Sequence, residues 1–356
     1  MKNIIYLLLL LFVAGSSVQI AQAQTEYTAQ LSGQQESLPV LTEASGQITA
    51  TLTGNILTVE GTFSNLSSNF DAAHIHIGLA GQDGDVLESL TVIPDADMRG
   101  GTLAAATNTF SLNTAEVNAL SNRNFYINIH STAHPSGEIR GQLLADNDAV
   151  YTATFSGSQE VPTVVSSGYG GAILELRGMQ LVVSGAFTGL DSDFDANTGA
   201  HIHIGLAGAN GPVSKPLVIT VDADGRGGII DPDLNSYILT EEEVTALQIR
   251  ALYINIHSVG QPSGELRGQV IPQVTALFRA HLSGANENPA VMTAAGGTIL
   301  AELNGRTLNL SGSFTGLSGT PTAAHIHIGF AGENGGVLAP LSITSVEDSH
   351  TILAGT

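Results

Sequence analysis

The pentapeptide His-Ile-His-Ile-Gly occurs three times in this chain, at residues 74–78, 201–205 and 325–329. The copies begin 127 and 124 residues apart, a spacing far longer than the period of solenoid repeats and close to the size of a small domain. The sequence therefore predicts a tandem array of three homologous units, each with a pair of histidines at the same point.

The three units are not equally long. We place unit one at residues 24–147, unit two at 148–273 and unit three at 274–356. Aligned on the histidines, Thr356 corresponds to residue 105 of unit one, so unit three has no counterpart of residues 106–147. We expect the sequence to be a fragment of a longer protein, because an incomplete sandwich would expose unpaired strand edges.

Short runs of alternating apolar and polar residues fill each unit. Residues 47–52 and 56–61 alternate in this way on either side of Gly54-Asn55. Unit three has Asn304-Gly305 at the same junction, which is a strong signal for a two-residue β-hairpin turn. Threonine, valine and isoleucine dominate the runs, as the half-buried surface of a sheet favours.

A single short helix is expected in each unit. Asn113 with Glu116 forms a capping pair ahead of an apolar run in unit one, and Thr240 with Glu243 does the same in unit two. Many short strands, frequent glycines and one connecting helix predict an all-β fold. We expect tandem antiparallel β-sandwiches.

Residues 1–23 have the pattern of a secretory signal peptide. Lys2 supplies a positive start, an apolar run of about ten residues follows, and small residues end at Ala23. That run is too short to span a bilayer, which needs about 20 apolar residues, and later apolar stretches are broken by polar residues. We expect a secreted protein without a membrane span, cleaved near Ala23 and placed in the periplasm, cell envelope or medium.

The charge balance excludes one class of partner. Eleven lysines and arginines stand against 32 aspartates and glutamates, which gives a formal net charge of −21. A surface of this kind repels nucleic acid, so we expect no nucleic-acid partner. The chain contains no cysteine, so disulfides are absent.

The histidine pairs are the candidate site that all three units share. In a strand, His74 and His76 share one face, and the isoleucines between them face the core. In the segment 126–130 the same alternation places His130 on the strand face opposite to Ile127 and Ile129. If the two strands are neighbours, three imidazoles converge in unit one.

The same reasoning applies to the other units. His201, His203 and His257 form the corresponding trio in unit two. Unit three keeps His325 and His327 as a partial site without the third histidine.

Two interpretations of the trios remain open. In one, the imidazoles bind loop carbonyls and lock the glycine-containing turn that begins at Gly78, Gly205 or Gly329. In the other, three imidazoles bind copper or zinc. The spacing is similar to that of the copper–zinc superoxide dismutases. Counterparts of their bridging histidine and of their cysteine pair are missing, so we expect no dismutase activity.

A second motif, Ser-Gly-Glu-x-Arg-Gly-Gln, occurs in both complete units. It places Glu138 and Arg140 on one strand face in unit one, and Glu265 and Arg267 in unit two. We expect each glutamate to form an ion pair, with its neighbouring arginine or across the strands.

Together these landmarks resemble the CHRD domain, named after chordin, an extracellular antagonist of bone morphogenetic proteins, and also found in secreted microbial proteins. The resemblance rests on Gly-x-x-Glu-x-Pro, Ala-Ala-His-Ile-His-Ile-Gly and Asn-Ile-His followed by Ser-Gly-Glu-Ile-Arg-Gly-Gln, and covers two full copies and one partial copy. Unit one has an extra residue between Glu36 and Pro39. The resemblance implies an immunoglobulin-like or superoxide-dismutase-like β-barrel fold, an extracellular location and no established catalysis. Growth-factor antagonism is not implied, because the cysteine-rich modules of chordin are missing.

The sequence thus predicts a secreted, non-enzymatic array with a binding or structural role at or outside the cell surface, and no required cofactor. Its partner would be an extracellular protein or polymer that the sequence does not name. One alternative is a copper- or zinc-binding protein that uses the histidine trios. Another is an adhesion or matrix protein.

Overall fold

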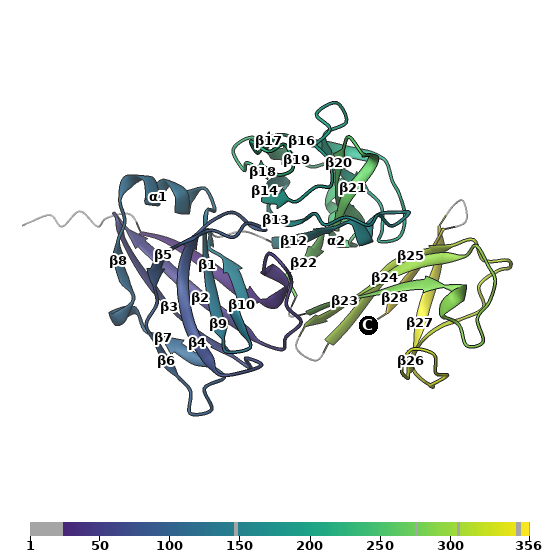
Figure 1. Ribbon diagram of the computed structural model, residues 1–356, viewed down its shortest axis with the longest axis horizontal. Coiled ribbons are helices and arrows are strands. Elements are labelled where there is room, and N and C mark those ends of the chain that lie inside the picture. The colour runs from purple at the N-terminus through teal and green to yellow at the C-terminus, as the bar shows by residue number, and fades with distance from the viewer. Residues whose placement is uncertain (1–23, 146–148, 275, 305–306, 347–349, 356) are drawn as a thin grey trace, which may run out of the picture.

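The computed structural model describes residues 24–145, 149–274, 276–304, 307–346 and 350–355 (Figure 1). The predicted signal peptide, residues 1–23, lies outside the described residues, as do residues 146–148 and Thr275. In the described part, no helix is long and apolar enough to cross a membrane.

Unit one consists of short strands and one α-helix. They are β1 (Gln24–Ser32), β2 (Ser45–Thr53), β3 (Ile56–Ser64), β4 (Phe70–Ile77), β5 (Asp85–Ser89), β6 (Val92–Pro94), β7 (Gly101–Leu103), β8 (Thr109–Ser111), α1 (Thr114–Ser121), β9 (Phe125–Ser131), β10 (His134–Gln142) and β11 (Leu144–Ala145).

Unit two repeats this series of elements. They are β12 (Ala149–Ser156), β13 (Tyr169–Arg177), β14 (Gln180–Thr188), β15 (Ala200–Ile204), β16 (Val213–Leu217), β17 (Ile219–Val221), β18 (Gly228–Ile230), β19 (Ser236–Ile238), α2 (Glu241–Gln248), β20 (Leu252–Ser258), β21 (Gln261–Gln269) and β22 (Ile271–Pro272).

Unit three repeats the first half of the series. Its strands are β23 (Ala276–Ser283), β24 (Gly296–Asn304), β25 (Thr307–Thr315), β26 (Ala324–Ile328), β27 (Gly336–Val346) and β28 (His350–Gly355).

The predicted all-β fold is confirmed. In unit one the sheet order is β5-β4-β9-β10-β1-β2-β3-β7-β6, and unit two has the same order with its own strands. Each of these sheets curls over on itself, as Figure 1 shows for unit one. The inward side chains of the two halves then pack on one another as in a sandwich. Unit three forms a six-stranded sheet among the described residues.

The alternation seen in the sequence produces these cores. Ile48, Ala50, Leu57 and Val59 are fully buried in the core of unit one, while the residues between them are more exposed. The hairpin closes with Thr53 opposite Ile56, so the two strands turn at Gly54-Asn55 as expected. Burial of these side chains contributes most of the stability of each unit.

The predicted helix caps are confirmed in both complete units. The side chain of Asn113 accepts from the backbone N–H of Glu116, whose carboxylate accepts in return from the backbone of Asn113. Thr240 and Glu243 form the same reciprocal pair at the start of α2. No α-helix occurs among the described residues of unit three.

Consecutive units pack through one repeated contact. Ala80 and Leu144 of unit one are buried against Ile173 on β13 of unit two. Ala207 and Ile271 of unit two are buried in the same way against Leu300 on β24 of unit three. An ion pair accompanies each contact, Arg123 with Glu175 and Arg250 with Glu302. Because the same apolar contact and the same type of ion pair recur at both junctions, consecutive units are arranged in a regular way.

We expect Glu175→Ala to lower the free energy of unfolding by about 1–3 kcal/mol, as judged by urea denaturation. Glu175 is 2% exposed and its loss leaves Arg123 without its carboxylate. Loss of one partner from a fully buried pair costs about 3–5 kcal/mol, and the 20% exposure of Arg123 reduces that figure. Thr51→Ala, at the equivalent position of unit one, is the matched control. Equal losses in the two variants would contradict a stabilising junction.

Candidate metal centre

Strand pairing brings the three histidines of unit one to one face. β4 runs antiparallel to β9, with Ala72 opposite His130, His74 opposite Asn128 and His76 opposite Tyr126. The alternate residues face the other way, and Ile75 is fully buried in the core. The two segments are therefore neighbours, and the histidines lie away from the core.

The imidazole nitrogens of unit one converge. His74 Nδ1 lies 3.0 Å from His130 Nε2. One ring nitrogen from each of His74, His76 and His130 can be chosen so that all three lie within 4.8 Å of one another. His76 and His130 are buried, and His74 is half-buried. The cluster is thus most accessible to solvent at His74.

Unit two reproduces the arrangement on β15 and β20. His201, His203 and His257 also place three nitrogens within 4.8 Å of one another. His201 Nδ1, His203 Nε2 and His257 Nε2 are all buried and have no hydrogen-bond partner. Buried polar atoms are normally satisfied, so three unpartnered nitrogens at one place make this cluster a candidate ligand set.

Backbone carbonyls fix the tautomers of two histidines in each unit. His76 Nδ1 donates to the carbonyl of Gly84 at 2.9 Å, and His130 Nδ1 donates to that of Pro135 at 3.0 Å. The proton on Nδ1 leaves the lone pair on Nε2, which is the nitrogen aimed at the cluster. Such carbonyl bonds orient histidines that ligate metals. His203 and His257 have the same bonds to Gly211 and Pro262.

Burial favours the neutral, ligating form of these rings. The pKa values of the three histidines of unit one are lowered by desolvation, and the same holds for the trio of unit two. The two interpretations of the histidines, loop locking and metal binding, are therefore compatible. One nitrogen of His76 locks the loop, and the other remains available.

The trio fits an ion such as copper or zinc after a small contraction. Two nitrogens bound to one ion at about 2.0–2.1 Å are at most about 4.2 Å apart. Nitrogens that lie as far as 4.8 Å apart must therefore approach one another by at least about 0.6 Å. His74 must also carry its proton on Nε2, because the lone pair of His130 Nε2 now accepts from His74 Nδ1. Three histidines leave a further coordination position open.

A stack of side chains holds the loop after each histidine pair. His76 is stacked on Tyr126 with ring centroids 4.8 Å apart, and the Arg140 guanidinium lies 3.5 Å from the centroid of the Tyr126 ring. Arg140 donates to the carbonyls of Leu79 and Gln82, each at 2.8 Å. In unit two, Arg267 and Tyr253 form the corresponding stack with His203.

The prediction that the glutamates of the Ser-Gly-Glu-x-Arg motif form ion pairs is wrong. Glu138 accepts from the hydroxyls of Thr42 and Ser131 and from the backbone of Ser67, while Arg140 binds loop carbonyls instead. A β-bulge between His134 and Ile139 interrupts the regular strand just before this point.

Glu265 departs from the prediction in the same way. It accepts from Ser166 and from the backbone of Asp191, while Arg267 donates to the carbonyls of Leu206 and Ala209. Both glutamates pin loops to the strand. The turn glycines Gly78 and Gly205 lie under the ring of Tyr126 or Tyr253, where an added Cβ would come within 3.2 and 3.0 Å.

Unit three retains the histidine pair only. His327 Nδ1 donates to the carbonyl of Gly335 at 2.9 Å, and the rings of His325 and His327 are 5.8 Å apart. Gly329 begins the same turn. In the portion of unit three that the structure describes, no third histidine joins the pair.

Two buried carboxyls were not among the sequence candidates. Glu36 lies beside Asn128, and desolvation raises its pKa to about 8. Glu160 lies beside Asn255 in unit two, and desolvation raises its pKa to about 7. The Gly-x-x-Glu-x-Pro pattern marked both positions, but only the fold shows that they are enclosed.

We expect the stability of the chain to fall as the pH rises because of Glu36. A carboxyl with a folded pKa of about 8 and an ordinary value of 4.5 binds its proton on folding. Its contribution is complete below pH 4.5 and is lost between pH 4.5 and 8, a loss of about 3–5 kcal/mol. Glu36→Gln should flatten this decline in urea denaturation between pH 5 and 9, whereas the exposed Glu43→Gln should not. An unchanged slope in Glu36→Gln would contradict the assignment.

Comparison with known families agrees with the repeated geometry. The CHRD domain family matches residues 27–143, 151–270 and 278–354, which gives two full repeats and one partial repeat. No curated protein is significantly similar to the chain.

Proposed function

The chain belongs to the CHRD domain family, and on this premise we propose that it is a secreted, non-enzymatic array whose complete units each bind one copper or zinc ion. The observation that carries the proposal is the trio of unit two, where three buried imidazole nitrogens meet without any hydrogen-bond partner. The role of the array is binding or structural, at or outside the cell surface.

The chemistry of the trio supports a transition metal. Neutral imidazoles are good ligands for copper and zinc, and poor ones for magnesium or calcium. The lowered pKa values keep the rings neutral at physiological pH. Duplication of the same cluster in two units favours a shared role over a local accident of packing.

A structural role of the array is supported by its junctions. The same apolar contact and the same arginine–glutamate pair recur at both junctions. Repeated interfaces of this kind hold neighbouring repeats in a fixed relation. An extended, ordered array suits a spacer or adhesive element, with an extracellular protein or polymer as its partner.

We expect the purified chain to bind about two equivalents of copper or zinc, measured by elemental analysis after loading and dialysis. His74→Ala and His201→Ala should each remove about one equivalent. Neither His74 nor His201 donates to a loop carbonyl, in contrast to His76 and His203, so these changes spare the loop. Because burial lowers the histidine pKa values, the bound metal should be retained below pH 6.5.

His134→Ala is the matched control, since His134 is on β10 outside the trio. Its metal content should equal that of the unaltered chain. The proposed metal function would be ruled out if neither copper nor zinc binds. It would also be ruled out if the double variant His74→Ala plus His201→Ala binds as much metal as the unaltered chain.

Secretion makes a separate prediction. A full-length chain expressed in a bacterium should be recovered from the periplasm or medium with Gln24 as its first residue, as read by N-terminal sequencing. Replacement of the apolar run 4–13 by a polar segment should retain the chain in the cytoplasm. Export of that variant at normal levels would contradict a signal peptide.

A further inference from the structure

Each complete unit uses one loop to contact the next unit. In unit one this docking loop is Leu79-Ala80-Gly81, and its tip is pressed against the sheet of unit two. A Cβ added to Gly81 would lie 2.2 Å from the backbone nitrogen of Gly171 and 2.7 Å from the carbonyl oxygen of Ala186. Only glycine allows this approach, and its φ of +81° also favours glycine.

The second junction uses the equivalent loop, Leu206-Ala207-Gly208. The carbonyl of Ala207 accepts from both the backbone N–H of Ser313 at 3.1 Å and its hydroxyl at 2.8 Å. Gly208 has a φ of +83° and faces the backbone of Thr298. The docking loop therefore recognises a pair of facing residues on two neighbouring strands, Gly171 with Ala186 or Thr298 with Ser313.

Unit three carries a third docking loop in the same conformation, Phe330-Ala331-Gly332. Gly332 has a φ of +84°, and the turn is closed by a bond of 3.0 Å from Glu333 to Phe330. The corresponding bonds in units one and two measure 3.1 Å each. A Cβ added to Gly332 would meet no atom within 4 Å. The loop is thus preformed for docking: the Gly332 carbonyl accepts from Asn288 of the same unit at 2.6 Å, and the side on which a Cβ would stand is open.

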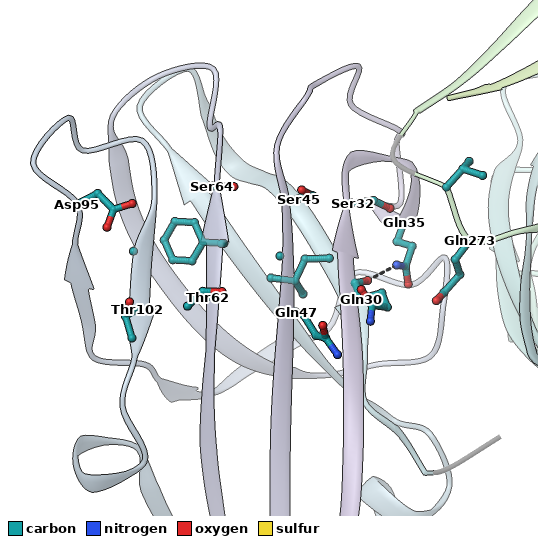
Figure 2. A pocket seen from close by; sticks show the side chains of 15 residues that line it. Gln30, Ser32, Gln35, Ser45, Gln47, Thr62, Ser64, Asp95, Thr102 and Gln273 are labelled. Atoms are coloured by element: carbon teal, nitrogen blue, oxygen red, sulfur yellow. Dashed lines mark hydrogen bonds between the residues drawn. The ribbon is translucent and has the colours of Figure 1, made fainter. Parts of the chain in front are cut away.

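Unit one carries the complementary receiving surface. The facing pair equivalent to Thr298 with Ser313 is Gln47 with Thr62, on β2 and β3. Both side chains are exposed and line an open hollow of about 720 Å³, whose far edge is formed by Gln273 and Val274 (Figure 2). The same position in units two and three is filled by the docking loop of the preceding unit.

We propose that the docking loop of unit three binds the hollow on unit one of a second copy of this chain, so that chains associate head to tail. The Thr62 hydroxyl occupies the position of the Ser313 hydroxyl and would donate to the carbonyl of Ala331. Two different, complementary surfaces on one molecule form a heterologous contact, which propagates into open chains rather than closed dimers.

The contact is weaker than the junctions within the chain. Unit one has Thr49 and Thr51 where the receiving surface of unit two has Ile173 and Glu175. The apolar anchor and the ion pair of the internal junctions are therefore missing. Glu333 and Asp95 add acidic groups on the two sides, and the net charge of −21 opposes association at low salt.

Sedimentation velocity of the secreted chain tests the proposal. At about 0.3 M salt, where like charges are screened, the weight-average mass should rise with protein concentration. Thr62→Glu, in the hollow, and Ala331→Glu, in the loop, should each abolish the rise. Thr220→Glu adds the same charge on an exposed strand of unit two and should leave it intact.

A gain of affinity provides the complementary measurement. Thr49→Ile restores the apolar anchor of unit two and should tighten association about ten-fold, equivalent to about 1.4 kcal/mol. Adding Ala331→Glu to this variant should return it to a monomer, which distinguishes docking through this loop from nonspecific association. A wild-type chain that stays monomeric at all concentrations, or association that survives both glutamate substitutions, overturns the proposal.

Discussion

A buried guanidinium in each complete unit organises everything around the histidines. Arg140 is 1% exposed, so each of its N–H groups needs an acceptor inside the protein. Two loop carbonyls supply acceptors, and the face of the Tyr126 ring lies directly against the cation. Because His76 packs on the other face of that ring, one stack sets the positions of loop, ring and imidazole together. In the complete units this cation thus helps to fix the path of the loop over the sheet.

The loop held by this stack has two working faces. Its inner side accepts the Nδ1 proton of His76 at Gly84, which fixes the tautomer of a candidate ligand. Its outer side, at Ala80 and Gly81, lies against the sheet of the next unit. The histidine trio and the junction between units thus share a single segment, residues 78–84. A substitution that loosens the loop would therefore disturb both the histidine trio and the junction between units.

The histidine trios and the sandwiches follow from local rules that the sequence displays. Strand alternation places His74 and His76 on one face, and the isoleucines identify that face as the outer one. The Glu138–Arg140 pair failed because a bulge and nearby hydroxyls decide its partners, and neither is visible in the spacing. Glu36 lies 92 residues from Asn128, so its enclosure depends on tertiary contacts that no local pattern encodes.

On the proposed function, selection among cations at the trios would depend on the donor atoms rather than on charge. The surface is strongly acidic and attracts cations of every kind, yet the three converging groups in each complete unit are neutral imidazoles. A hard cation such as calcium prefers oxygen ligands and gains little from three nitrogens. Copper and zinc bind imidazole well, and the two carbonyl bonds already hold two of the three rings in the ligating tautomer. The acidic surface would therefore concentrate cations in general, while the trios would retain only those with an affinity for nitrogen.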